Sequence, residues 1–229
     1  MRRKFALIIF ALFFITFLNG TDSRVAAQDL PHKRTVTVCV LSDVTPHLTI
    51  GSKTVELRPV PKEKIKKIIG GASKEYGTNA GITFEVVEYH DIQVNIHPMP
   101  SSQAEALRLA CPLGEMVAVF TNQQMVVWPD PVPMPDGKLS VSLPRIYDGW
   151  SDPYYGITWI FSVEFWDVDK RGSSPVQTLK HEVGHLFDLE HSPASSDFMY
   201  EKGMSDAWSD RIREELKMNI NTHWKMKPE

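Results

Sequence analysis

The sequence lacks the features typical of small disulfide-rich, nucleic-acid-binding and membrane-embedded proteins. It has only two cysteines in 229 residues, and no CxxC pair that could hold a structural zinc ion. The formal net charge is -3 and no long run of one charge occurs, so nucleic acid is not expected as a partner. No internal repeat is present, and the length fits one substantial domain.

Long apolar runs are also missing, apart from one near the N-terminus. Three basic residues precede a run of fourteen apolar residues that ends at Leu18. A membrane-spanning helix needs about 20 apolar residues, whereas this pattern is typical of a secretory signal peptide. We expect residues 1–27 to be a signal peptide cleaved after Ala27, with a cut near Gly20 or a retained membrane anchor as alternatives. The protein is therefore expected to be secreted or periplasmic, with no other membrane contact.

The two cysteines, Cys39 and Cys111, can be read in two ways. An exported chain can join them in a disulfide, and buried free thiols are the alternative. Neither cysteine lies near the histidine-rich segment described below.

The remaining patterns predict an α+β domain over residues 28–229. β-Branched residues predict a strand over 34–44, and apolar residues at helical spacing predict a helix over 60–81 that begins at Pro61. Further expected elements are two short strands within 82–98, a helix over 101–111, strands over 115–123 and within 156–165, and a C-terminal helix over 205–220 capped by Ser205 or Ser209. The proline-rich segment 128–135 is expected to be an irregular loop. Aromatic residues between Tyr147 and Trp166 are interpreted as packing residues rather than a substrate-binding wall.

Residues 173–191, "SSPVQTLKHEVGHLFDLEH", predict a helix that carries the candidate metal-binding and catalytic side chains. Ser174 and Gln177 have the spacing of a capping box, with proline at the first helical position. Apolar residues at spacings of three and four form one stripe, and two histidines lie on the opposite side, one turn apart. The apolar residues are Val176, Leu179, Val183 and Leu186.

His181 and His185 can direct their imidazole nitrogens at one zinc ion, and the carboxylate of Glu182 lies beside them. A catalytic zinc needs a third protein ligand and one position for water, and a neighbouring carboxylate can then act as general base and general acid. His191 is the candidate third ligand, six residues after His185. We expect one catalytic zinc ion as the cofactor.

These residues resemble the metzincin zinc peptidases, whose pattern is H-E-x-x-H-x-x-G-x-x-H followed by a methionine turn. The match comprises His181, Glu182, His185, His191 and the later "SPASSDFMY", which contains Met199. The resemblance implies a zincin-like fold: a twisted mixed sheet with two helices, the active-site helix and a small C-terminal helical subdomain. It also implies that Met199 lies beneath the metal. The matrixins share the "HS…MY" style, and the archaemetzincins share the methionine spacing but have cysteines for a second zinc that this chain lacks. Tyr200 is not assigned to the metal.

Asp188 departs from the pattern, which has glycine there. In the family this glycine adopts a positive φ at the helix end, so that the chain turns back to its third ligand. Aspartate tolerates the left-handed region at a cost of about 1 kcal/mol, so we expect the site to persist.

The sequence therefore predicts a secreted zinc endopeptidase, a monomer that acts on peptide or protein substrates bound along an edge strand. One alternative is a non-catalytic surface protein that binds zinc for structure. Another is a gluzincin-type peptidase whose third ligand is a downstream glutamate: Glu201, Glu214 or Glu215.

Overall fold

The computed structural model describes residues 33–50, 52–96, 100–127, 132–133, 139–140, 144–165, 174–201, 205–221 and 224. The predicted signal peptide, residues 1–27, lies outside them. Most of the proline-rich segment 128–135 also lies outside, except Val132–Pro133, which form the short strand β7.

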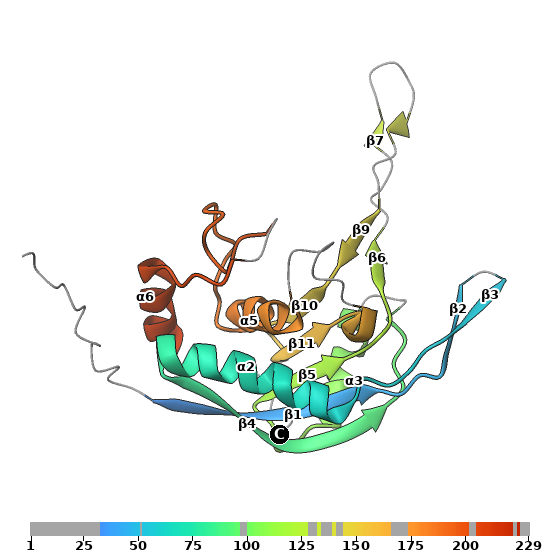
Figure 1. Cartoon of the computed structure of the whole chain (residues 1–229), viewed down its shortest axis with the longest axis horizontal. Helices are drawn as coiled ribbons and strands as arrows, with labels where there is room; N and C mark the ends of the chain where they lie inside the picture. Colours follow the sequence, from blue (N-terminus) through green and yellow to red (C-terminus); the bar gives the residue numbers. More distant parts are fainter. Residues whose placement is uncertain are drawn as a thin grey trace, which may run out of the picture. The chain divides into compact units, whose positions relative to one another are not determined.

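A five-stranded sheet in the order β10-β11-β5-β1-β4 is the centre of the fold (Figure 1). Four strands are parallel, and β10 pairs antiparallel with β11 at one edge. The prediction of a mixed sheet is therefore confirmed. The strands are β1 (Arg34–Asp43), β4 (Ile82–Ile92), β5 (Met116–Phe120), β10 (Gly149–Asp152) and β11 (Ile157–Ile160).

Residues Ile82–Ile92 form one long strand, β4, and the described residues that follow it, 93–96, form no second strand, so the prediction of two short strands here is wrong. β4 pairs with β1 from Arg34↔Ile82 to Asp43↔Ile92, with a register shift between Val38 and Cys39. A bulge of this kind accommodates one extra residue while hydrogen bonding continues on both sides. The strand therefore does not end where its alternation of polar and apolar residues is interrupted.

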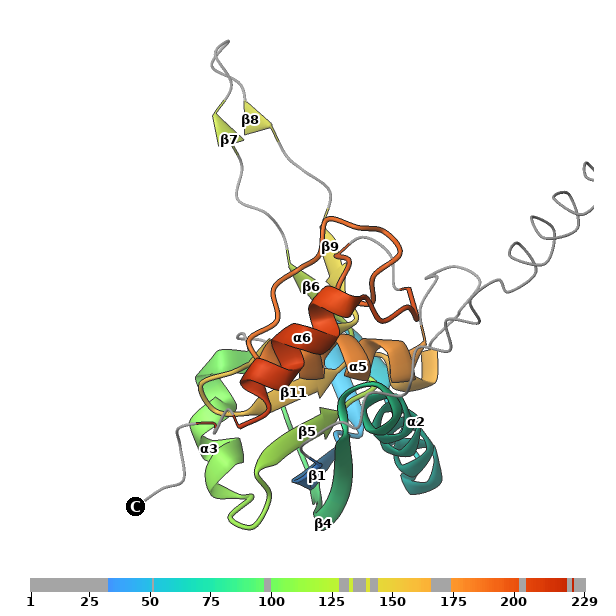
Figure 2. The same cartoon turned by 90° about the vertical axis from the view of Figure 1, so that its left-hand side faces the viewer.

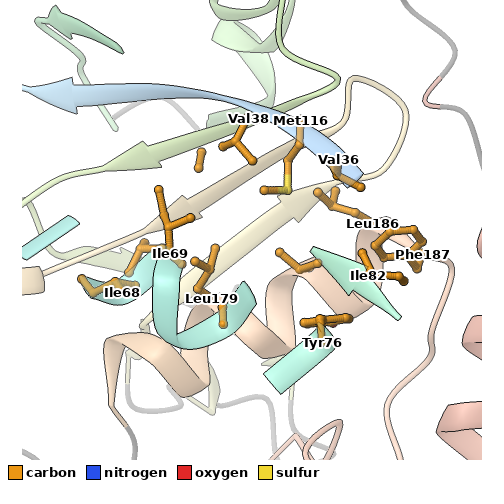
Figure 3. Close-up of a cluster of buried hydrophobic side chains, with 14 of the residues drawn as sticks. Val36, Val38, Ile68, Ile69, Tyr76, Ile82, Met116, Leu179, Leu186 and Phe187 are labelled. Atoms are coloured by element: carbon orange, nitrogen blue, oxygen red, sulfur yellow. The ribbon is translucent and has the colours of Figure 1, made fainter. Parts of the chain in front are cut away.

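The inner strands β1, β5 and β11 are buried on both faces because their side chains alternate between two cores. In β1, Val36, Val38 and Val40 face one core, whereas Cys39 and Leu41 face the other. Residues of three helices contribute to the first core, part of which is shown in Figure 3, and residues of α3 contribute to the second. The three helices are α2 (Lys62–Ala80), α5 (Pro175–Leu186) and α6 (Asp210–Asn219); α3 (Ala104–Leu109) follows the 3-10 turn η1 (Pro100–Gln103).

The predicted helices are present, with adjusted ends. α2 follows Pro61 and ends at Ala80, where it is capped by Gly81, whose φ of 71° is the left-handed conformation that glycine adopts without strain. α6 begins later than predicted, because Ser209 rather than Ser205 caps it by accepting a hydrogen bond from the backbone N–H of Ile212. None of the described helices has the length and apolar content that a membrane span requires.

Cys39 and Cys111 form a disulfide, which decides between the two readings of these cysteines. It joins the middle of β1 to the residue that follows the α3 turn, across 72 positions of sequence. Both residues are fully buried in the second core.

The described residues also form three two-stranded sheets. β2 (His47–Ile50) pairs with β3 (Lys53–Glu56), β6 (Met125–Val127) with β9 (Arg145–Tyr147), and β7 with β8 (Leu139–Ser140). Figures 1 and 2 show that the β7–β8 pair lies farther from the five-stranded sheet than the β6–β9 pair. β9 is followed, after one residue, by β10 at the edge of the five-stranded sheet.

Candidate metal centre

Helix α5 has the start and the apolar face that the sequence predicts. The Ser174 side chain accepts from the backbone N–H of Gln177, and the Gln177 side chain accepts from the backbone N–H of Ser174, which completes the capping box. Leu179, Val183 and Leu186 are fully buried in the first core. Burial of this stripe fixes the rotation of the helix about its axis and so directs the histidine side away from that core.

Three histidine side chains meet on this side of α5. The Nε2 atoms of His181, His185 and His191 lie 3.2 Å apart in each of the three pairs. The three rings differ in exposure: His181 is buried, His185 is intermediate and His191 is exposed. The structure therefore brings together the three residues that the sequence singled out as metal ligands.

The protons on two of these rings are placed by backbone carbonyls. Nδ1 of His181 donates to the Phe198 carbonyl at 2.9 Å, and Nδ1 of His185 donates to the Leu189 carbonyl at 2.8 Å. A neutral imidazole with its proton on Nδ1 has a lone pair on Nε2. Burial lowers the pKa of His181 to about 4 and also lowers the pKa of His185, opposed in each case by the backbone hydrogen bond, so both rings favour the neutral, metal-binding form.

Converging lone pairs at this spacing repel one another unless a cation lies between them. Nitrogen ligands at 2.0–2.1 Å from a tetrahedral zinc are separated by about 3.3–3.4 Å. The observed separation of 3.2 Å is close to that value, and hydrogen bonds from the far ring nitrogens to carbonyls are the usual outer support of zinc-binding histidines. The donor set thus fits zinc.

Asp188 adopts a φ of 59°, as predicted for the residue in the position that the metzincins fill with glycine. The turn begins where Leu189 donates its backbone N–H to the Gly184 carbonyl, 3.0 Å away. Two side chains from the C-terminal part of the chain donate hydrogen bonds to backbone carbonyls at this helix end. The Asn219 amide donates to the Phe187 carbonyl, and the Trp224 indole N–H donates to the Leu186 carbonyl. Neither residue carries a sequence signal, because both reach the helix end only through tertiary packing.

The turn at residues 197–199 packs beneath α5 and supports His181. Met199 is fully buried, and its Sδ lies 2.4 Å from the position that a Cβ on Gly184 would occupy. Only glycine therefore permits this approach between the helix and the methionine. Tyr200 follows, and its backbone bridges to Ser192 at the start of the same segment.

Asp197 holds this turn in place, and the sequence did not single it out as a site residue. Its Oδ1 accepts the backbone N–H of Met199 at 3.1 Å, and its Oδ2 accepts the hydroxyl of Ser209 at 2.8 Å. Because Ser209 also caps α6, one buried carboxylate joins the methionine turn to the C-terminal helix.

Glu182 is buried between α5 and the edge strand β10. The Ser151 hydroxyl lies 2.7 Å from Glu182 Oε2 and 2.8 Å from the Glu182 carbonyl oxygen. Burial raises the pKa of Glu182 to about 7; the Ser151 hydrogen bond opposes this rise, and the charge of Asp148 adds to it. A carboxyl group in such surroundings has a pKa suited to both accepting and donating a proton.

Two hollows meet at the histidines. The first, about 640 Å³, includes Glu182, Tyr147, Trp150 and Glu201 in its lining. The second, about 710 Å³, includes Asp188 and Glu190 in its lining. The lining of both includes Ser151, His185 and His191.

The aromatic residues pack as the sequence predicts, and two of them also line the first hollow. Trp159 and Phe161 are fully buried in the second core, and Tyr147 and Trp150 are partly buried against the same core while lining the hollow. Trp166 lies outside the described residues.

Two of the three glutamates considered as alternative third ligands form ion pairs on α6. Glu214 and Glu215 pair with Lys217 and Arg211 on α6, and only Glu201 reaches the lining of the first hollow. Among the described residues, one further group has metal-ligand spacing, formed by Cys39, Glu88 and His90, but the sulfur of Cys39 is taken up by the disulfide.

Comparison with known proteins identifies the fold. No protein-family model matches the chain, and no curated protein matches it. The solved structure of archaemetzincin from Methanopyrus kandleri matches with a TM-score of 0.50 and 16% identity, over 81% of this chain and 96% of that chain. Metalloproteinase-II from Bacteroides fragilis matches with a TM-score of 0.47 and 12% identity, over 82% and 54% of the two chains. A second archaemetzincin, from Archaeoglobus fulgidus, has a TM-score of 0.45 and 11% identity, over 80% and 99%. The similarity shows that this chain has a metzincin-like fold.

Proposed function

We propose that this chain, which has a metzincin-like fold, is a secreted zinc-dependent endopeptidase. The observation that carries the proposal is the convergence of three imidazole Nε2 atoms, 3.2 Å apart, beside the buried carboxyl group of Glu182 in an accessible hollow. A zinc site needed only for structure requires no adjacent carboxyl group, so Glu182 favours catalysis over the non-catalytic alternative.

His181, His185 and His191 would hold one zinc ion, and Met199 packs against Gly184 of the helix that carries the first two. The bound ion would supply Lewis acidity toward water and toward the carbonyl group of the substrate. His191 already lies within 3.2 Å of both other Nε2 atoms, which supports it over Glu201 as the third ligand.

Glu182 would transfer a proton from the attacking water to the leaving amine. Its carboxylate accepts a proton from the attacking water as the bond between that water and the scissile carbonyl carbon forms, and then donates it to the leaving amine as the C–N bond breaks. Its burial between α5 and β10 keeps the group in a low-dielectric setting where its two protonation states are closely balanced.

The substrate would be an extended peptide bound along β10. This strand is at the edge of the sheet, and among the described strands none pairs with its outer side. An extended chain could add to it by main-chain hydrogen bonds, with side chains entering the two hollows that meet at the histidines. The enzyme would act as a monomer, without nucleic acid.

Export is supported by the Cys39–Cys111 disulfide, because such bonds persist mainly in oxidising compartments. It agrees with the signal peptide expected over residues 1–27. Any attachment to a membrane would depend on an uncleaved signal.

A cleavage profile on a peptide library tests the proposal. The purified protein, loaded with zinc, should cleave a subset of peptides, and both chelation and Glu182→Gln should abolish cleavage while Glu182→Gln keeps its zinc. A protein that binds one equivalent of zinc but cleaves nothing beyond the Glu182→Gln control would support the non-catalytic alternative instead.

A further inference from the structure

The edge strand β10 contacts the side chain of Glu182 through two residues on the same face. Gly149 and Ser151 are two positions apart, so their side-chain directions coincide in a strand. Both lie against α5 at Glu182, and both line the first hollow. The contact is therefore made at the point where the proposed general base faces the cleft.

Ser151 supplies a hydrogen bond to one carboxylate oxygen. Its Oγ lies 2.7 Å from Glu182 Oε2 and donates to it when the carboxylate is ionised. A bond to Oε2 fixes the orientation of the carboxyl plane. It also leaves Oε1 as the oxygen available to exchange a proton.

Gly149 provides the space beside the other oxygen. A Cβ at this position would lie 2.7 Å from Glu182 Oε1, 2.6 Å from Glu182 Cγ and 2.8 Å from Thr178 Cγ2. Gly149 does not have a positive φ, so the restriction here is the close approach of α5 rather than backbone conformation. Any side chain would displace the carboxyl group that Ser151 holds.

We propose that Ser151 and Gly149 position the general base: Ser151 anchors Oε2 of Glu182, and Gly149 keeps Oε1 free to take a proton from water and return it to the leaving amine. This inference rests on the proposed peptidase function. Neither residue contacts the reacting atoms, so both are positioning residues. Their effect should appear in the chemical step and not in zinc binding.

The test compares two substitutions of equal shape. Ser151→Thr keeps the hydroxyl, and Ser151→Val replaces it with a methyl group of similar size. On a quenched fluorescent peptide chosen from the cleavage profile, Ser151→Thr should keep kcat within about threefold of the unmodified protein, whereas Ser151→Val should lower kcat by about 10- to 100-fold. KM and zinc content should be similar in both, because an interaction that orients the base affects kcat rather than substrate binding.

Thr158 offers a matched control. It pairs directly with Ser151 across the antiparallel strands β10 and β11, and its hydroxyl is buried with no hydrogen-bond partner among the described residues. Thr158→Val therefore removes a neighbouring hydroxyl without removing a contact to Glu182, and kcat should be unchanged. Gly149→Ala should lower kcat by about 100-fold or more with zinc retained, because the carboxyl group must move.

Crystal structures of the variants provide a readout besides activity. The Glu182 carboxyl group should keep its orientation in Ser151→Thr and rotate in Ser151→Val. If Ser151→Val retains the kcat of Ser151→Thr, or if Glu182 is oriented identically in both, the positioning role is wrong even though cleavage and its loss in Glu182→Gln still establish the peptidase. If the unmodified protein cleaves no more than Glu182→Gln, the proposed function fails first, and the positioning role fails with it.

Discussion

Replacing Asp197 by alanine should weaken both the fold and the metal site. Its side chain is 2% exposed and accepts hydrogen bonds from the backbone N–H of Met199 and the hydroxyl of Ser209, while Arg211 lies 3.6 Å from Oδ2. The Phe198 carbonyl, which orients the His181 ring, lies in the same turn. One substitution therefore acts on the methionine turn, on the cap of α6 and on the support of a ligand.

The expected size of the effect follows from these contacts. A buried hydrogen bond to a charged group contributes about 1.5–3 kcal/mol, so the loss of two bonds in Asp197→Ala should lower the free energy of unfolding by about 3–6 kcal/mol. For a domain of this length, that corresponds to a fall in Tm of about 6–24 °C. Asp197→Asn keeps an acceptor for the Met199 N–H and the shape of the side chain, and should cost about 1–2 kcal/mol.

Zinc affinity should fall as well, by about 10- to 100-fold, because a loosened turn no longer fixes the orientation of the His181 ring. Urea denaturation in excess chelator measures the stability without the metal, and competition with a chromophoric chelator measures the affinity. Asp210 is a suitable control, since it is an exposed carboxylate of the same helix region that pairs with Arg213; Asp210→Ala should change neither measurement. If Asp197→Ala had the stability and zinc affinity of the unmodified protein, the turn would not depend on the Asp197 carboxylate.

Three further predictions concern the disulfide, the third ligand and the helix end. Replacing Cys39 and Cys111 by alanine should lower the free energy of unfolding by about 2–4 kcal/mol, measured by urea denaturation, because the bond spans 72 positions of sequence; an unchanged midpoint would contradict this. His191→Ala should abolish stoichiometric zinc binding in dialysed protein, whereas Glu201→Ala should leave it intact, and the reverse result would establish the glutamate ligand. Asp188→Val should destabilise the protein by about 2 kcal/mol because a β-branched residue is strained at a φ of 59°, while Asp188→Gly should stay within about 1 kcal/mol of the unmodified protein in thermal unfolding; equal midpoints for the two would show that the turn is not strained.

The helix with the histidines could be predicted closely because its signals are local. A capping box, an apolar stripe and two histidines one turn apart all depend on spacings within a single helix. The turn at Asp188 was expected from the resemblance to the metzincins, and aspartate is one of the few residue types that tolerate the positive φ found there.

Positions that depend on contacts between distant segments could not be predicted in this way. The continuity of β4 depends on pairing with β1 through a bulge, which leaves no clear mark in the strand itself. The disulfide remained one of two readings, because spacing along the chain does not determine whether two cysteines come within bonding distance.

The sequence alone determined the chemical groups of the site: three imidazoles and a carboxyl group at spacings that suit one zinc ion. The tertiary structure decided which groups surround them. Ser151 and Gly149 reach Glu182 because the antiparallel edge strand packs on α5, and Asp197 links the methionine turn to α6 because both are buried against the same core. The physical reason is that helical periodicity relates residues a few positions apart, whereas the neighbours of a buried carboxyl group are selected by packing between elements that the sequence separates.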